Sequence, residues 1–235
     1  YSGVEIAKVG GHVQPLDWPL RFGGRLEELY QSRVRALPGR TQTLLLLAAA
    51  DPTGEPALIW NAARNLGTDP GAAEAAGVER LVSWEPRVRF RHPLARLAAY
   101  HSASPEERRR VHAALADVSD TISDPDRLAW HRAAAAREPD EDVAAELERS
   151  ATRARARGGL PAAAAFLERA AQLTPDLHRR GIRAIAAAEA KHQAGAPDAA
   201  ARLLAMTEAG LGDEPARARL SLVRGRMAFH GGMSG

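Results

Sequence analysis

Apolar residues recur every three or four positions along most of the chain, which is the spacing of helices that bury one face. The first such helix is predicted over residues 25–37. Thr41 is expected to cap a second helix that ends near Asp51, and Pro56 opens a third. Residues 70–78, which are rich in alanine, predict a short fourth helix. The inward positions expected in the first helix are Leu26, Leu29, Tyr30, Val34 and Leu37.

The spacing changes near residue 81, where short alternating runs replace the helical period. Residues 81–84 are expected to be extended, Glu85-Pro86 turns the chain, and residues 87–91 form a second strand. Two short strands after several helices predict a β-wing, as in winged helix-turn-helix domains. Pro93 then opens a helix whose expected inward residues are Leu94, Leu97, Ala98 and Tyr100. In the second strand, Val88 and Phe90 are expected to face away from Arg87, Arg89 and Arg91.

Helices alone are expected in the rest of the chain. Ser104 and Glu107 have the spacing of a capping box, in which the two side chains satisfy backbone N–H groups at a helix start. Asp124-Pro125 opens a further helix, and another covers about residues 140–157.

A sequence segment in the C-terminal half recurs after 36 residues. Gly159-Leu160-Pro161 introduces PAAAAFLERAAQL, and Gly195-Ala196-Pro197 introduces PDAAARLLAMTEA. A helix pair that recurs at roughly 34 to 40 residues is the signature of tetratricopeptide-like arrays. Such pairs cannot bury their apolar faces alone, so they stack on their neighbours. We therefore expect a superhelical array that begins near residue 125 and continues past Gly235.

Composition narrows the classes of function. The 235 residues include no cysteine, which excludes disulfides and thiolate metal sites. The net charge is +3, but acidic and basic residues alternate closely, which is typical of a solvated surface rather than a DNA footprint. No apolar run approaches the roughly 20 residues that span a bilayer, and no signal peptide is evident, so we expect a cytoplasmic protein without a membrane partner. The chain opens on Tyr1 rather than Met, which favours a fragment.

His92 is the one residue whose position suggests binding chemistry. It ends a predicted strand and directly precedes the helix that Pro93 opens. A helix N-terminus carries unpaired N–H groups and a partial positive charge, which suit a phosphate, and a histidine there can donate to a phosphate oxygen. The alternative is that His92 caps the helix or packs against the wing. Both hypotheses stay open from the residues alone.

No other residue is a candidate for a site. The predicted arginine face of the wing (residues 87, 89 and 91) can be solvated, which we favour, or can meet DNA phosphates or the glutamates of another domain. The eight histidines show neither an i, i+4 pair nor a carboxylate constellation, so no metal ligand is predicted, and His131 is expected at a helix–helix interface. Phosphate-loop, dinucleotide-binding and nucleophile-elbow motifs are missing, so no catalytic residue is predicted.

A family resemblance adds to these expectations. The text RFRHPLARLAAYHSASPEERRRVHAALADV, residues 89–118, resembles the winged-helix segment of the large ATP-dependent LuxR-type regulators of actinobacteria, which belong to the STAND class of P-loop ATPases. Residues 124–176 and 37–67 are also similar to the family, and the resemblance spans roughly residues 25–230. It implies that His92 contacts the β-phosphate of a bound nucleotide and holds the ADP-bound state. Arg91 and Pro93 depart from the apolar residue and the aspartate that often flank that histidine.

The sequence thus predicts a mainly α-helical chain with an irregular lead-in at residues 1–24, a winged-helix-like domain at 25–120 and tetratricopeptide-like repeats at 121–235. The resemblance implies the middle segment of a bacterial transcriptional regulator that couples nucleotide state to effector sensing and assembly. ATP or ADP would be bound mainly by residues outside this chain. The implied partners are the ATPase core and the C-terminal DNA-binding domain of the same protein, an unknown small-molecule or protein effector, and further copies of the protein. DNA would be reached only through the missing domain.

Two other functions stay open from the sequence. One is a free-standing helical scaffold for protein interactions, without a nucleotide role. The other is a winged-helix protein that binds DNA directly.

Overall fold

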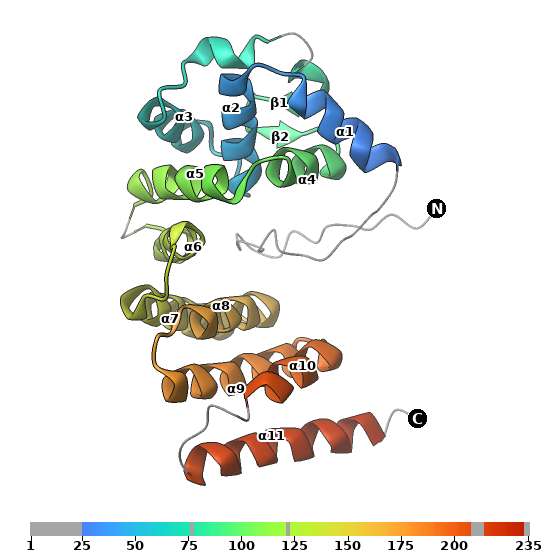
Figure 1. Ribbon diagram of the computed structural model, residues 1–235, viewed down its shortest axis with the longest axis vertical. Coiled ribbons are helices and arrows are strands. Elements are labelled where there is room, and N and C mark those ends of the chain that lie inside the picture. Colours follow the sequence, from blue (N-terminus) through green and yellow to red (C-terminus); the bar gives the residue numbers. More distant parts are fainter. Residues whose placement is uncertain (1–24, 76–77, 121–122, 208–213, 233–235) are drawn as a thin grey trace. The chain divides into compact units, whose positions relative to one another are not determined.

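The computed structural model describes residues 25–75, 78–120, 123–207 and 214–232 (Figure 1). The predicted irregular lead-in lies outside these ranges. The chain forms two compact units, the first ending at Ala103 and the second beginning at Ser104. Helices make up most of the described residues of both units, and the two short strands belong to the first. The prediction of a mainly α-helical fold is therefore confirmed.

Three helices begin the first unit: α1 (Arg25–Arg35), α2 (Gly39–Ala50) and α3 (Pro56–Asn65). α2 is the central element, because every residue from Leu44 to Ala50 is buried and the helix packs against α3 and the later helix α4. In α1, Val34 is buried as predicted. Leu26 and Leu29, which were also expected to face inward, are 49% and 44% exposed, so the start of this apolar face is not covered.

Thr41 does not cap α2, because the helix begins two residues earlier and Thr41 lies within its first turn. The prediction of a cap was therefore wrong. The side chain is buried, and its hydroxyl donates to the carbonyl of Ala72 at 2.9 Å. Ala72 belongs to the 3-10 helix η1 (Pro70–Ala73), which stands where an α-helix was predicted. Thr41 thus ties α2 to a segment 31 residues further along the chain.

The predicted strand pair is present in a short form. After the 3-10 turn η2 (Val78–Arg80), strands β1 (Val82–Ser83) and β2 (Arg89–Phe90) pair antiparallel, with Val82 opposite Phe90. Val88 is buried while the arginines on either side of it are exposed, so the predicted alternation is confirmed. Whether this hairpin is the wing of a winged-helix domain stays a prediction.

Helix α4 (Pro93–His101) follows the hairpin directly and packs against α1, α2 and β2. Pro93 begins it, as predicted. Of its predicted inward residues, Ala98 and Tyr100 are buried, whereas Leu94 and Leu97 are only half-buried. The buried residues of the helix are Ala95, Ala98, Ala99 and Tyr100.

A tight loop between α2 and α3 holds the second strand in place. Asp51 is 1% exposed, and its Oδ2 accepts from the Thr53 hydroxyl at 2.5 Å and from the Gly54 N–H at 3.1 Å. Gly54 adopts a positive φ of 63°, and its carbonyl accepts from the N–H of Val88 at 2.9 Å. Arg87 donates to the Thr53 carbonyl at 3.1 Å. The loop is therefore hydrogen-bonded to two consecutive residues that lead into β2.

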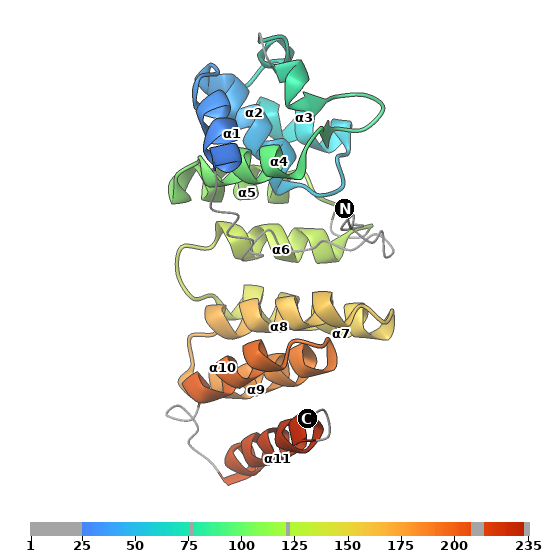
Figure 2. The same cartoon turned by 90° about the vertical axis from the view of Figure 1, so that its right-hand side faces the viewer.

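Seven helices lie in the described part of the second unit: α5 (Pro105–Asp117), α6 (Pro125–Ala135), α7 (Glu141–Ala156), α8 (Leu160–Leu173), α9 (Leu177–Gln193), α10 (Pro197–Thr207) and α11 (Glu214–Gly232). Each packs against the next one in the chain (Figure 2). α5, which the sequence assigned to the domain at residues 25–120, groups with these helices. Its predicted capping box is confirmed, with Ser104 Oγ accepting from the Glu107 N–H at 3.2 Å and Glu107 Oε2 accepting from the Ser104 N–H at 2.8 Å.

Two glycines in the left-handed conformation form equivalent turns. Gly158, with φ of 78°, joins α7 to α8, and Gly195, with φ of 81°, joins α9 to α10. The residue after each glycine donates its N–H to the carbonyl five positions back, at 2.9 Å in both turns. The repeat seen in the sequence therefore corresponds to two helix pairs with the same connecting turn. Their assignment as tetratricopeptide-like units stays a prediction.

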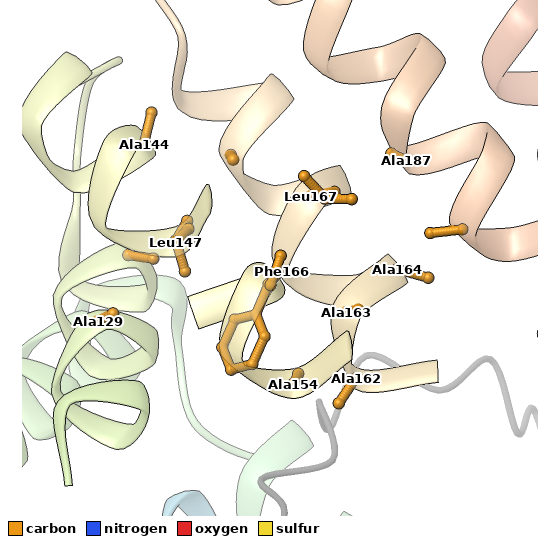
Figure 3. Close-up of a cluster of buried hydrophobic side chains, with 14 of the residues drawn as sticks. Ala129, Ala144, Leu147, Ala154, Ala162, Ala163, Ala164, Phe166, Leu167 and Ala187 are labelled. Atoms are coloured by element: carbon orange, nitrogen blue, oxygen red, sulfur yellow. The ribbon is translucent and has the colours of Figure 1, made fainter. Parts of the chain in front are cut away.

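The packing around helix α8 explains why the first repeat contains a run of alanines. It packs against α7 and α9 and also contacts α6, so most of its circumference is enclosed. Alanine leaves the room that such close helix approach needs. Figure 3 shows the resulting cluster, in which Leu147, Phe166 and Leu167 stand among many alanines. The buried residues of α8 are Ala162, Ala163, Ala164, Phe166, Leu167, Ala170, Ala171 and Leu173.

Replacement of Gly54 tests the loop that holds β2. A Cβ at this position would lie 2.2 Å from the Val88 carbonyl oxygen, whereas a Cβ at Gly67, which has a similar φ of 69°, meets nothing within 4 Å. We expect Gly54→Ala to lower the free energy of unfolding by about 3 kcal/mol, from backbone strain together with the clash, and Gly67→Ala by about 1 kcal/mol from strain alone. Urea unfolding followed by circular dichroism measures both values. Equal losses would contradict the proposed contact between the loop and the strand.

Candidate functional site

His92, the predicted site residue, is the N-cap of α4. Its Nδ1 accepts a hydrogen bond from the N–H of Leu94 at 3.1 Å. The ring is half-buried and stacks on Tyr30 of α1, with ring centroids 5.4 Å apart and planes 18° from parallel. His92 therefore joins β2, α1 and α4, and the capping hypothesis describes its position in this structure.

The N-terminus of α4 does not offer the bare amides that we expected for a phosphate. Pro93 has no N–H. The Leu94 N–H is taken by His92 Nδ1, and the Ala95 N–H donates to the His92 carbonyl at 3.0 Å. The Arg96 N–H donates to the same carbonyl at 3.4 Å. The expectation of unpaired amides was wrong, because the histidine that was to share the phosphate with them satisfies the first one itself.

The cap fixes the tautomer of the His92 ring. Because Nδ1 accepts a hydrogen bond, the neutral ring carries its proton on Nε2. Nε2–H is then the donor that His92 can present to a phosphate oxygen or another acceptor. The role of His92 as a nucleotide sensor stays a prediction, and it rests on this one atom.

Arginines surround this junction. Arg33 of α1 lies over the Tyr30 ring, 5.7 Å from its centroid. Arg89 and Arg91 are exposed on either side of Phe90. These positively charged side chains can interact with an anion or can simply be solvated.

Helix α4 also carries a half-buried charge that the sequence did not reveal. Arg96 of α4 donates from Nε to the carbonyl of Ala49 at 3.0 Å. Burial lowers the pKa of Arg96, and the negative charge of Asp51 acts in the opposite direction. The C-terminal end of α2 thus receives a guanidinium beside its last carbonyls, which complements the helix dipole.

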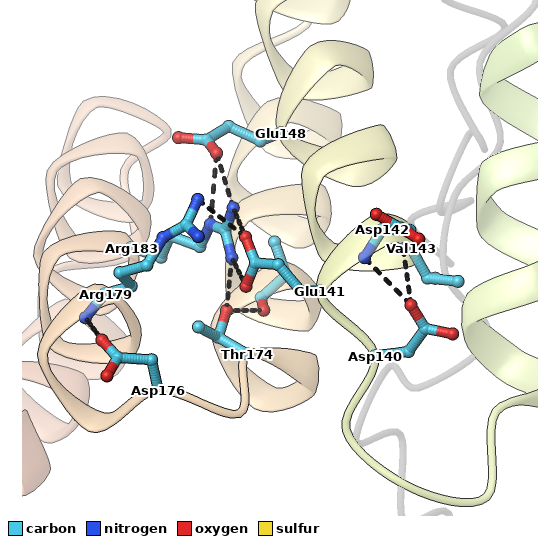
Figure 4. A network of polar contacts seen from close by, with 10 residues as sticks. Asp140, Glu141, Asp142, Val143, Glu148, Thr174, Asp176, Arg179 and Arg183 are labelled. Atoms are coloured by element: carbon cyan, nitrogen blue, oxygen red, sulfur yellow. Dashed lines mark hydrogen bonds and ion pairs between the residues drawn. The ribbon is translucent and has the colours of Figure 1, made fainter.

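A second polar centre lies among α7, α8 and α9, around Arg183 (Figure 4). This side chain is 4% exposed. It donates to both carboxylate oxygens of Glu141 at 2.9 and 3.0 Å, twice to Glu148 Oε2 at 3.0 and 3.1 Å, and to Thr174 Oγ1 at 2.7 Å. A guanidinium has five N–H donors, and these bonds use all five. Arg183 is therefore a clamp between helices and has no donor left for a ligand.

The charges of this clamp stabilise each other. Burial acts to lower the pKa of Arg183, but its hydrogen bonds to Glu141 and Glu148 outweigh burial and raise the pKa. The hydrogen bond from Arg183 lowers the pKa of Glu141 below its ordinary value. Both partners thus stay charged across the physiological range, which is the condition for a structural ion pair rather than for proton transfer.

The histidines form no metal site in the residues that the structure describes, where no group of three or more potential ligands converges. His131 lies at a helix–helix interface, as predicted, and contacts His112 there. None of the helices within the described ranges combines the length and hydropathy that a membrane span requires. Comparison with protein-family models, with curated proteins and with solved structures gave no match for this chain.

Two substitutions of His92 separate its capping contact from its stacking contact. His92→Ala removes both and should lower the stability of α4 by about 1 kcal/mol. Asparagine is also a good N-cap, so His92→Asn should recover most of this loss although it cannot stack on Tyr30. Hydrogen exchange of the α4 amides measures the local stability without requiring the two units to unfold together. Equal losses in both variants would show that the stack, not the cap, holds the junction.

Proposed function

We propose that this chain is the middle part of a bacterial ATP-dependent LuxR-type transcriptional regulator and performs no catalytic step itself. The support is the order of its parts: a helical domain with a short strand pair, a histidine at the strand-to-helix junction, and an array of helix pairs. In this proposal the protein works in the cytoplasm. ATP or ADP is bound mainly by residues outside this chain, and DNA is reached through a separate domain of the same protein.

The observation that carries the nucleotide role is the fixed tautomer of His92. With Nδ1 held by the Leu94 N–H, Nε2–H is available as a donor whose direction is set by the cap and by the stack on Tyr30. A phosphate that accepts from Nε2 would favour one arrangement of α1, β2 and α4. Loss of that contact would relax this arrangement. Nucleotide state would in this way be passed from the ATPase core to the first unit.

The helical array would sense the effector and mediate assembly. Its helix pairs are held by internal contacts such as the Arg183 clamp, so its outer surfaces remain for partners. The partner is an unidentified small molecule, a protein, or a further copy of the regulator.

A second candidate function is a free-standing scaffold for protein interactions. The two equivalent glycine turns favour it, because stacked helix pairs serve this purpose without any nucleotide. A direct DNA-binding role has less support, since Arg87 already donates to the Thr53 carbonyl and the strand pair is only two residues long. Salt-sensitive binding of mixed-sequence duplex by this chain would revive that alternative.

The test uses the longer protein that contains the ATPase core, loaded with ADP. His92→Asn keeps an acceptor for the Leu94 N–H but removes the donor at Nε2. If Nε2 contacts the phosphate, His92→Asn should release ADP faster by about tenfold, which corresponds to one lost hydrogen bond to a charged group. His92→Ala should release it at least as fast. Stopped-flow fluorescence with a labelled ADP measures the rates.

The matched control is Tyr30→Phe, which keeps the ring beneath His92 and should leave the release rate unchanged. Unaltered ADP release in His92→Asn would reduce His92 to a helix cap and remove the nucleotide role. A reading frame without a phosphate-binding loop upstream of residue 1 would favour the scaffold.

A further inference from the structure

The second unit buries two histidines against each other where α5 meets α6. His112 of α5 is 1% exposed and His131 of α6 is 0% exposed. Their Nδ1 atoms lie 2.9 Å apart. Such a contact requires one ring to donate an N–H to the lone pair of the other. We propose that this pair is an acid-sensitive latch, which holds α5 to α6 while the rings are neutral and releases them when the rings take up protons.

The interface is built for neutral rings. A proton on the accepting Nδ1 would place two N–H groups against each other and remove the hydrogen bond. A proton on an Nε2 atom keeps that bond but creates a buried cation. Nε2 of His131 is buried and has no hydrogen-bond partner among the described residues, so an N–H at this atom would point at no acceptor. Burying a charged group in this way costs far more than burying a neutral one.

The charges around the pair also oppose protonation, and they come from three helices. Arg108 lies one turn before His112 in α5, Arg127 lies one turn before His131 in α6, and Arg169 reaches the pair from α8. Burial, with Arg108 and Arg169, lowers the pKa of His112 to about 4. Burial, then His112 and Arg127, lowers the pKa of His131 to about 3.

The nearby carboxylates are engaged with other cations. Asp124, at the N-cap of α6, pairs with Arg127 at 3.4 Å. Glu146 of α7 pairs with Arg132 at 2.7 Å. In the first turn of α5, Glu107 binds the backbone and hydroxyl of its own cap. Glu106 of the same turn pairs with Arg109 and with Arg137, which follows α6.

The direction of the pH effect follows from these positions. In the closed interface both histidines have pKa values below the ordinary value of about 6.5, so the open state binds more protons. The closed interface is therefore fully favoured above about pH 6.5 and weakens as the pH falls toward 4. A group with a pKa of 6.5 when open and about 4 when closed favours opening about thirtyfold at pH 5.

The other interfaces of the array keep their charges in this range, so acid acts first on α5 and α6. Asp126 of α6 binds Arg153 and Arg157 of the segment that ends α7. Burial acts to raise the pKa of Asp126, but the hydrogen bonds from Arg157 and Arg153 outweigh it and lower the pKa. The Arg183 clamp likewise lowers the pKa of Glu141. Both carboxylates remain ionised at pH 5.

Hydrogen exchange of the intact chain at pH 7.5 and pH 5.0, corrected for the intrinsic rate, tests the latch. We expect the amides of α5 and α6 to lose protection by about thirtyfold or more at pH 5.0, while those of α8 and α9 change little. His131→Asn, which cannot titrate here, should remove a large part of this loss. His101→Asn changes an exposed histidine and should leave the loss unaltered.

Three results would overturn the proposal: unchanged protection of α5 and α6 at pH 5.0, an equal loss in His131→Asn and the unsubstituted chain, or a simultaneous opening of all helices. If His131→Asn does not fold, nuclear magnetic resonance of the unsubstituted chain decides. The ring carbons of His112 and His131 should keep the shifts of neutral imidazole until the α5 amides open. Protonation near pH 6.5 with α5 and α6 still protected would refute the latch.

Discussion

The close approach of helices through alanine is the constraint on which the second unit depends. α8 is covered by α7 and α9, and larger side chains on its enclosed faces would push these neighbours apart. Polar contacts between helices add to this packing. Arg183 of α9 donates to two glutamates of α7, and the rings of His112 and His131 meet between α5 and α6.

In the first unit, single polar residues hold the loop before α3 and the start of α4 in place. Asp51 shapes the loop whose Gly54 carbonyl holds the segment before β2. His92 closes the start of α4 and packs on α1. Each of these joints thus depends on a single polar side chain.

The sequence predicted most of what is local. Helix spacing, the Ser104 capping box and the alternation around Val88 all follow from residues that lie near each other in the chain. Predictions from the sequence failed for side chains whose hydrogen-bond partners are distant in the chain. Thr41 bonds a carbonyl 31 residues away, so its hydroxyl was mistaken for a cap. His112 and His131 are 19 residues apart on separate helices, and only their packing brings them together.

The candidate site was predicted in position but not in chemistry. His92 stands at the strand-to-helix junction, as expected, yet the amides that were to bind a phosphate are already bonded within α4. A residue that serves as a cap uses up the N–H donors that would otherwise bind an anion at a helix start, and sequence alone does not say which use prevails.

The close packing of α8 against its neighbouring helices is the feature on which the second unit depends. Ala163 is 0% exposed and Ala165 of the same helix is only half-buried. Urea unfolding of Ala163→Leu should show a loss of about 2 kcal/mol or more, against less than about 0.5 kcal/mol for Ala165→Leu. Equal stability of the two variants would contradict the account.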